Sequence, residues 1–192
     1  FMANGATNFV EKQQRSGQEY PLQEVNQLFR NIAGTRFEDM TEVAGSLCAG
    51  VEVSRGTSFG DIDNDGDIDI LVGNNTGPAR LFLNNVGADN HWLGIKLTSQ
   101  ESTTPVVQCR IKIEQAGQSV KWRVPRTDGS YLSANDARVI VGLADCNKSA
   151  TITVYWQGGR VERWPDHAEV LTARPEIDRC RQHGSAGPQT QE

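Results

Sequence analysis

Five aspartates occupy alternate positions from Asp61 to Asp69, within the stretch SFGDIDNDGDIDILVGN at residues 58–74. Carboxylates held this close repel one another and raise each other's pKa values, so an uncompensated loop of this kind opposes folding. Alternate side chains of a loop that turns around a centre point the same way, and Gly66 permits the sharp positive-φ turn between them. The spacing therefore predicts a loop that closes around a cation.

The pattern Asp-x-Asp-x-Asp-Gly-x-x-Asp suits a hard cation with about six to eight oxygen ligands. We expect side-chain ligands from Asp61, Asp63, Asp65 and Asp69, and a carbonyl ligand from Asp67, whose own side chain is expected to face water. Calcium is favoured over magnesium because several carboxylates and a carbonyl make a flexible cage, whereas magnesium demands a tight octahedron and retains water. The predicted cofactor is Ca²⁺.

An acidic loop of this kind has two other interpretations. An EF-hand requires a glutamate at the twelfth loop position, but the twelfth residue from Asp61 is Val72, within an apolar strand. The EF-hand is therefore excluded. A solvated acidic turn without metal is the second alternative, and it leaves the mutual repulsion of four carboxylates unrelieved.

Short alternating or β-branched runs, bounded by Gly, Asn, Asp and Pro, recur along the chain and predict an all-β fold. Gln157-Gly158-Gly159 predicts a hairpin turn between the last two strands. The expected strands are Gln27–Asn31, Arg36–Met40, Ile68–Val72, Arg80–Asn84, Trp92–Leu97, Cys109–Gln115, Gln118–Val124, Ala137–Val141, Thr151–Trp156 and Arg160–Trp164.

An internal echo indicates a repeat. QLFRN at residues 27–31 resembles RLFLN at residues 80–84, about fifty residues later, and FMANG at residues 1–5 resembles ILVGN at residues 70–74. Short strands and acidic, glycine-rich loops at this period are typical of β-propeller blades. Repeat units bury their faces against neighbours, so one and a half units require either further blades or a cap. The echo stops near residues 87–90, where we expect a domain boundary.

Charge and composition exclude several partners. The 24 acidic and 19 basic residues give a net charge of -5, and the remainder of the chain is near neutral once the aspartate loop is set aside. Neither nucleic acid nor an anionic membrane surface is indicated as a partner. No apolar run approaches the roughly 20 residues that span a bilayer. The sequence opens at Phe1, which we interpret as a processed protein or a fragment.

Four cysteines, Cys48, Cys109, Cys146 and Cys180, form no CxxC pair, which leaves disulfides or buried free thiols. Asn74 and Asn147 begin N-x-S/T sequons and are candidate glycosylation sites, provided that the protein is secreted by a eukaryote. We expect an exported protein with at least one disulfide, located outside the cell, at the cell surface or in the periplasm.

No catalytic residues are predicted. The histidines His91, His167 and His183 lie in unlike contexts, and no serine elbow, phosphate loop or HExxH motif occurs. His91 is expected to be a packed or capping residue. Trp122, Trp156 and Trp164 are expected to pack in a core, with a sugar-stacking platform as the alternative.

Residues 55–74, RGTSFGDIDNDGDIDILVGN, resemble an FG-GAP/VCBS repeat, the propeller blade of integrin α subunits and of many bacterial exported proteins. The segments NHWLGIKL, GSYLSANDARVIVGL and TVYWQGGRVERW resemble the ASPIC/UnbV domain, which follows such propellers in the cartilage acidic protein family. The resemblance implies a partial propeller at residues 1–88, a small β-sandwich-like domain at 89–174 and a polar C-terminal tail at 175–192. It transfers the metal ligands Asp61, Asp63, Asp65 and Asp69, and no substrate site.

The chain departs from the second family at two places, where Cys109 and Cys146 replace small residues. These two cysteines are therefore candidates for a disulfide. The resemblance implies a calcium-dependent, exported interaction, adhesion or assembly module with a structural metal. Its expected partners are the remaining blades or further copies of itself, with a glycan as another candidate. The alternatives are a polysaccharide lyase or an accessory protein of a biosynthetic enzyme, and a structural subunit of an extracellular filament or large complex.

Overall fold

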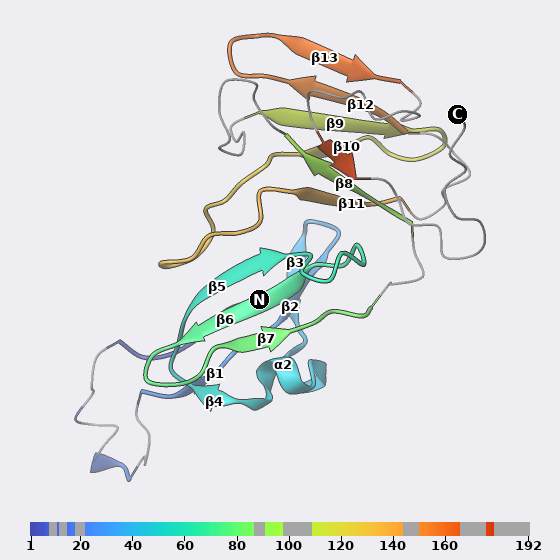
Figure 1. Cartoon of the computed structure of the whole chain (residues 1–192). Helices are drawn as coiled ribbons and strands as arrows, with labels where there is room; N and C mark the ends of the chain where they lie inside the picture. The colour runs from blue at the N-terminus through green and yellow to red at the C-terminus, as the bar shows by residue number, and fades with distance from the viewer. Residues whose placement is uncertain are drawn as a thin grey trace. The chain divides into compact units, whose positions relative to one another are not determined.

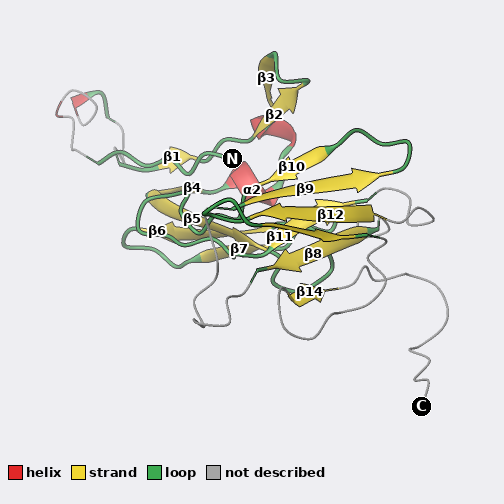
Figure 2. Cartoon of the chain, turned by 90° about the horizontal axis from the view of Figure 1, so that it is seen from above, coloured by secondary structure: helices red, strands yellow, loops and turns green. Residues whose placement is uncertain are grey.

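The chain folds into β-strands with short helical segments, which confirms the predicted all-β class (Figure 2). The computed structural model describes residues 1–7, 11, 15–17, 22–86, 91–97, 109–143 and 150–165, and the backbone of 176–178. It comprises two compact units. Unit 1 contains Phe1–Phe59, Asp69–Leu83 and Asp128–Ala134, and unit 2 contains Gly60–Ile68, Asn84–Thr127 and Asn135–Glu192.

The two units interleave along the sequence. The chain leaves the main part of unit 1 at Leu83, close to the predicted boundary, whose residues 87–90 lie outside the described ranges. The aspartate loop, however, groups with unit 2, and the later segment Asp128–Ala134 groups with unit 1. A single cut in the sequence therefore does not separate the two units.

Unit 2 contains two antiparallel sheets, seen as separate layers in Figure 1. One sheet has the order β10-β9-β12-β13 and the other has the order β11-β8-β14. The strands are β8 (Trp92–Lys96), β9 (Arg110–Gln115), β10 (Lys121–Arg123), β11 (Val139–Gly142), β12 (Ala150–Tyr155), β13 (Val161–Trp164) and β14 (Glu176–Asp178).

A single hydrophobic core lies between these sheets, as in a β-sandwich. Alternation positions it: Ile111 and Ile113 of β9 are buried, whereas the intervening Lys112 is only half-buried. Each such aliphatic side chain contributes about 1.5–3 kcal/mol when it is fully buried. The cluster consists of Leu93, Ile95, Leu97, Cys109, Ile111, Ile113, Val139, Val141, Leu143, Ala150, Ile152 and Val154.

Strand β14 lies within residues 175–192, the predicted polar tail. Its residues Glu176–Asp178 pair antiparallel with β8, with Ile177 opposite Ile95. β8 thereby becomes the central strand of its sheet, with β11 on its other side. Three residues with one apolar member carry too little periodicity to be recognised as a strand from the sequence, so only backbone pairing reveals it.

Unit 1 contains a three-stranded sheet of order β5-β6-β7, the hairpin β2-β3 and the antiparallel pair β1-β4. The described strands form no closed sheet. The elements are β1 (Glu24–Val25), β2 (Phe29–Ile32), β3 (Arg36–Asp39), η1 (Thr41–Val43), α2 (Ser46–Ala49), β4 (Val51–Glu52), β5 (Ser54–Gly60), β6 (Asp69–Asn74) and β7 (Arg80–Phe82). None of the described helices has the length and apolar character of a membrane span.

Strand β5 was missed by the sequence analysis. Its residues SRGTSFG lack apolar alternation and include two glycines, both of which weaken a strand signal. Gly56 is required where it stands, because a Cβ there would lie 2.3 Å from the carbonyl oxygen of Tyr131 and 2.2 Å from Ser133 Oγ. The amide of Thr57 also donates to Ser130 Oγ at 3.1 Å. Contacts with a distant segment of the same unit therefore define this strand.

The internal echo corresponds to two similar antiparallel contacts. In the second copy, Leu71 of β6 lies opposite Leu81 of β7. In the first copy, Met2 forms an antiparallel bridge with Gln27, with backbone hydrogen bonds of 2.8 and 3.0 Å in the two directions. The two echoed segments thus meet each other in both copies, which supports a structural repeat.

Polar contacts join β4 to β6 and β7 in unit 1. Glu52 accepts hydrogen bonds from Arg80 Nη2 at 2.6 Å and Nε at 2.9 Å through one carboxylate oxygen. Its other oxygen accepts from Asn74 Nδ2 at 2.7 Å. The hydrogen bond from Arg80 is the main reason that the pKa of Glu52 lies below its ordinary value of 4.5.

This lowered pKa predicts a pH-dependent contribution to stability. Because the folded pKa is depressed, Glu52 stabilises unit 1 fully above pH 4.5, and this contribution is lost as the pH falls through the folded value. The stability difference between the protein and Glu52→Gln should therefore narrow on acidification from about pH 7 to about pH 3. Hydrogen exchange of the β4 and β7 amides measures this stability difference. If the difference between the parent protein and Glu52→Gln were the same at both pH values, the lowered pKa of Glu52 would be contradicted.

Candidate metal site

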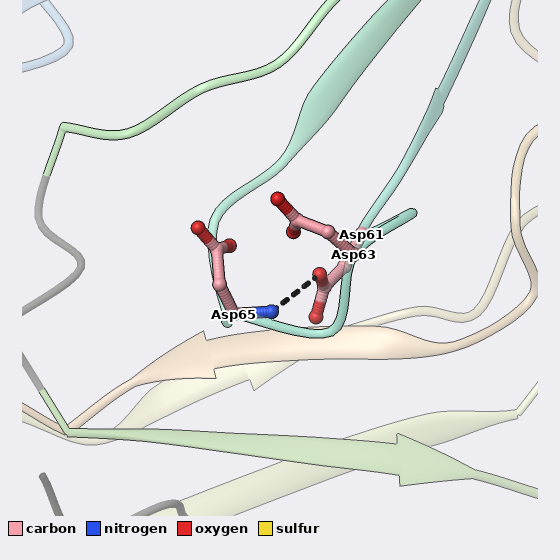
Figure 3. A group of neighbouring side chains, drawn as sticks. All are labelled: Asp61, Asp63 and Asp65. Atoms are coloured by element: carbon pink, nitrogen blue, oxygen red, sulfur yellow. Dashed lines mark hydrogen bonds between the residues drawn. The ribbon is translucent and has the colours of Figure 1, made fainter.

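The aspartate loop runs from Gly60 to Ile68, between the end of β5 and the start of β6. Three of its carboxylates converge: oxygens of Asp61, Asp63 and Asp65 all lie within 4.8 Å of one another (Figure 3). Asp61 is buried, Asp65 half-buried and Asp63 exposed. Across the described ranges, this is the one group of three or more acidic, histidine or cysteine side chains that meets so closely.

Backbone amides hold the loop in its turn. The Asp65 amide donates to one carboxylate oxygen of Asp61 at 3.1 Å, and the Gly66 amide donates to the other at 3.2 Å. The Asp67 amide donates to Asp65 Oδ1 at 2.9 Å. Asn64 and Gly66 have φ angles of 60° and 95°, so the chain bends sharply twice. These bonds give Asp61 and Asp65 a local role, because each of the two accepts from an amide further along the loop.

Within the acidic cluster, the pKa of Asp61 is raised above its ordinary value. Burial raises the pKa of its carboxyl, and the nearby charge of Asp65 raises it further. The Gly66 and Asp65 amides and the positive charge of Arg138 act in the opposite direction. Burial is the largest of these effects, so the ionised carboxylate is disfavoured in the metal-free loop. A bound cation would reverse this balance.

Arg138, immediately before β11, binds the loop through two nitrogens of its guanidinium group and Asp136 through the third. Nη1 donates to Asn64 Oδ1 at 2.6 Å, Nη2 donates to the carbonyl oxygen of Asp61, and Nε donates to Asp136 Oδ2 at 2.5 Å. Asp136 also accepts from the Arg138 amide at 2.9 Å. The planar fork of an arginine suits this triple contact, which a lysine cannot reproduce.

Trp92 of β8 supports the loop from a second side. A Cβ added at Gly66 would lie 2.1 Å from atoms of the Trp92 ring, so the glycine backbone packs directly on the indole. Trp92 is only 7% exposed although its neighbour Leu93 points into the core. Both faces of β8 are therefore covered, one by the sandwich core and the other by packing that includes this loop.

The structure brings together three of the four predicted side-chain ligands. Asp69 is fully buried at the first position of β6 and lies outside the close group of carboxylates. Asp67 was predicted to provide its carbonyl oxygen, and this part of the prediction is not tested by the grouping of side chains. Its side chain was expected to face water, but the residue is half-buried and its Oδ2 atom is enclosed. The prediction of a water-facing Asp67 is therefore wrong.

The converging oxygens fit a calcium ion. Calcium binds oxygen at about 2.3–2.6 Å, so two ligands on opposite sides of the ion are about 4.6–5.2 Å apart. The 4.8 Å limit on the Asp61, Asp63 and Asp65 oxygens is compatible with this span. Each Asp61 oxygen accepts one amide and keeps a second lone pair. If a metal binds, the side chains of Asp61, Asp63 and Asp65 would hold it, and its positive charge would neutralise their carboxylates.

The candidate glycosylation site at Asn74 has an amide engaged in the fold. Its Nδ2 donates to Glu52 at 2.7 Å and to the Pro78 carbonyl oxygen at 2.9 Å, while its Oδ1 accepts from Ser54 Oγ at 2.8 Å. A glycan on Nδ2 would replace one of these donated hydrogens. Asn147 lies outside the described residues.

The cysteines that the structure describes are buried free thiols. Cys48 lies in α2 and Cys109 in the core of unit 2. Burial raises the pKa of both thiols, which lowers their reactivity. Cys146 and Cys180 lie outside the described residues, so the pairing of Cys109 with Cys146 stays a prediction.

The tryptophans divide into two groups. Trp156 and Trp164 pack against the core of unit 2, which confirms the prediction for these two. Trp122 does not, because it is 47% exposed on β10. His91 is half-buried beside Trp92 and its backbone carbonyl accepts from the Leu143 amide at 2.6 Å, in keeping with a packed residue. His167 and His183 lie outside the described residues.

Sequence reasoning did not identify Arg138 or Trp92 as parts of this site. Arg138 is 77 residues from Asp61 along the chain, and no local spacing connects them. The available signal was indirect, since both residues fall in segments that resemble the second family, NHWLGIKL and GSYLSANDARVIVGL.

Comparison with known families supports the C-terminal resemblance. Residues 99–170 match the family described as ASPIC and UnbV. Within unit 2, this range includes β9 to β13 and Arg138. Searches among curated proteins and solved structures give no match to the chain.

Proposed function

We propose that this chain is a calcium-binding interaction module of an exported protein, in which the metal has a structural role. The observation that carries the proposal is the convergence of the Asp61, Asp63 and Asp65 carboxylates on a loop that is anchored by Arg138. The position of the acids in the loop, with Phe59-Gly60 before them, supports the resemblance to an FG-GAP/VCBS repeat. The loop joins two strands, so a bound ion would fix their connection.

The proposal includes a protein partner for unit 1, either further propeller blades or a second copy of the chain. Among the described residues of this unit, few hydrophobic side chains are buried: Cys48, Val53 and Val72. Its exposed large hydrophobic side chains are more numerous: Met2, Val25, Phe37, Val43, Val51, Leu71, Leu81, Leu83, Tyr131 and Leu132. Leu71 and Leu81 lie opposite each other in the β6-β7 pair and are 40% and 49% exposed. A propeller blade covers such a face with its neighbour.

Asp63→Asn provides a direct test of calcium binding. Asp63 is exposed and the structure gives it no role in the loop's internal bonds described above, so this variant should unfold like the parent protein in EDTA. In about 10 mM calcium, a site with a Kd of about 10⁻⁴–10⁻³ M stabilises the parent by about 1.4–2.7 kcal/mol. Asp63→Asn should lose most of this gain in denaturant unfolding.

Glu42→Gln is the matched control, because it removes an exposed acid from η1, outside the loop. It should retain the full response to calcium. Equal unfolding of the parent protein in calcium and in EDTA would contradict the proposed function, as would an undiminished calcium response in Asp63→Asn.

A further inference from the structure

The side of the four-stranded sheet that faces away from the core carries aromatic and basic residues. The register establishes this: Ile111, Ile113, Ile152 and Val154 point into the core, so the alternate positions of β9 and β12 point outward. Pairing then adds residues from β10 and β13 to the same side. Apart from two threonines of β12, the outward residues are Arg110, Lys112 and Glu114 of β9, Trp122 of β10, Tyr155 of β12, and Val161 and Arg163 of β13. We call this group the outer face.

Two rings and one guanidinium form the centre of the outer face. The Trp122 and Tyr155 ring centroids are 5.6 Å apart, with an angle of 34° between the ring planes. Arg110 lies over both rings, with its guanidinium carbon 5.6 Å from the Trp122 centroid and 5.8 Å from the Tyr155 centroid. These contacts hold the rings in place through cation–π attraction. They join three strands, β10, β9 and β12, which are neighbours in the sheet (Figure 1).

This cluster is accessible. Trp122 is 47% exposed and Val161, which pairs with Tyr155, is 53% exposed. A tryptophan held at an open surface by a neighbouring cation loses little further conformational entropy when a ligand covers it. Trp156 and Trp164, by contrast, pack against the core and cannot contribute a comparable surface.

The charge of the outer face is opposite in sign to that of the chain. It has three basic side chains, Arg110, Lys112 and Arg163, against the single acid Glu114, which pairs with Lys112 at 2.7 Å. The face is therefore net positive, whereas the whole protein has a charge of -5. A basic surface on an acidic protein attracts an anionic ligand to that surface selectively.

We propose that the outer face binds an anionic polysaccharide. The apolar faces of sugar rings would stack on Trp122 and Tyr155, and carboxylate or sulfate groups would bind Arg110 and Arg163. Guanidinium groups suit both anions because they donate bidentate hydrogen bonds. The combination of an aromatic surface with flanking cations distinguishes this ligand from an apolar protein partner, which would favour a face without net charge.

Two anionic probes distinguish the source of the negative charge: an oligogalacturonate, which carries carboxylates, and a heparin oligosaccharide, which carries sulfates. A cello-oligosaccharide of equal length serves as the neutral control. Binding is measured by calorimetry in EDTA, so that the result does not depend on the proposed metal site. We expect at least one anionic probe to bind, with an affinity that decreases as salt is added, and the neutral probe to bind at least about tenfold more weakly.

Variants identify the surface. Trp122→Ala and Arg110→Gln should each weaken binding of the anionic probe by about tenfold or more. Phe37→Ala and Arg36→Gln remove an exposed aromatic and an exposed base from β3 in unit 1, and should leave the affinity unchanged. Near-ultraviolet circular dichroism confirms that each variant is folded, and Arg110→Lys provides a second variant that retains the charge and should bind with intermediate affinity.

Three results would overturn the proposal: no binding of either anionic probe, equal binding of the neutral probe, or unchanged affinity in folded Trp122→Ala. Each of these is independent of the calcium response of Asp63→Asn. Failure of the polysaccharide proposal and failure of the calcium proposal are therefore distinguishable.

Discussion

Gly66→Ala is expected to destabilise unit 2 by about 2–4 kcal/mol, through two separate effects. The backbone of Gly66 has a φ of 95°, which residues other than glycine rarely adopt. In addition, the new methyl group would lie 2.1 Å from the buried Trp92 ring, so either the loop or the indole has to move. All four tryptophans belong to unit 2, so their fluorescence during urea unfolding reports the stability of this unit.

Gly158→Ala separates the two effects. Gly158 has a similar φ of 89° in the hairpin between β12 and β13, but a Cβ there would have no atom within 4 Å. This control should cost only the conformational strain, about 1–2 kcal/mol. Equal destabilisation by Gly66→Ala and Gly158→Ala would show that the loop does not pack on Trp92 as described.

Arg138→Lys is expected to have the second large effect. The arginine donates to Asn64, to the Asp61 carbonyl oxygen and to Asp136, whereas a lysine ammonium cannot reach all three with the geometry of the fork. Loss of these contacts should destabilise unit 2 by about 2–3 kcal/mol in EDTA. If the loop binds calcium as proposed, Arg138→Lys should also lower the calcium affinity through loss of loop order, because the positive charge is retained.

Arg163→Lys is the matched control, since Arg163 lies on strand β13 and makes no contact with the loop in the bonds described above. It should leave both the urea midpoint and the calcium titration unchanged. If Arg138→Lys behaved like this control in both measurements, Arg138 would have no role in ordering the loop.

Much of the strand content could be predicted because it is encoded by local patterns. The hairpin of β12 and β13 follows from the alternating apolar residues of β12 and the Gly-Gly turn after it, and Gly158 and Gly159 have the positive φ angles that such a turn requires. The strands that were missed, β1, β4, β5 and β14, lack such patterns, and β1 and β4 have only two residues each. β5 is polar and glycine-containing, and β14 has three residues, so both depend on contacts with distant segments.

The sequence alone was enough to predict the acidic loop. Its alternating aspartates and Gly66 bring three carboxylates together, because hydrogen bonds between near neighbours in the chain turn these side chains inward. Only the tertiary structure decided that this loop packs within unit 2, against Trp92 and Arg138. It also decided which tryptophan remains exposed, leaving Trp122 open and Trp156 and Trp164 packed. Both outcomes depend on contacts between segments far apart in the chain, which local spacing cannot specify because their free energy arises only when the sheets pack.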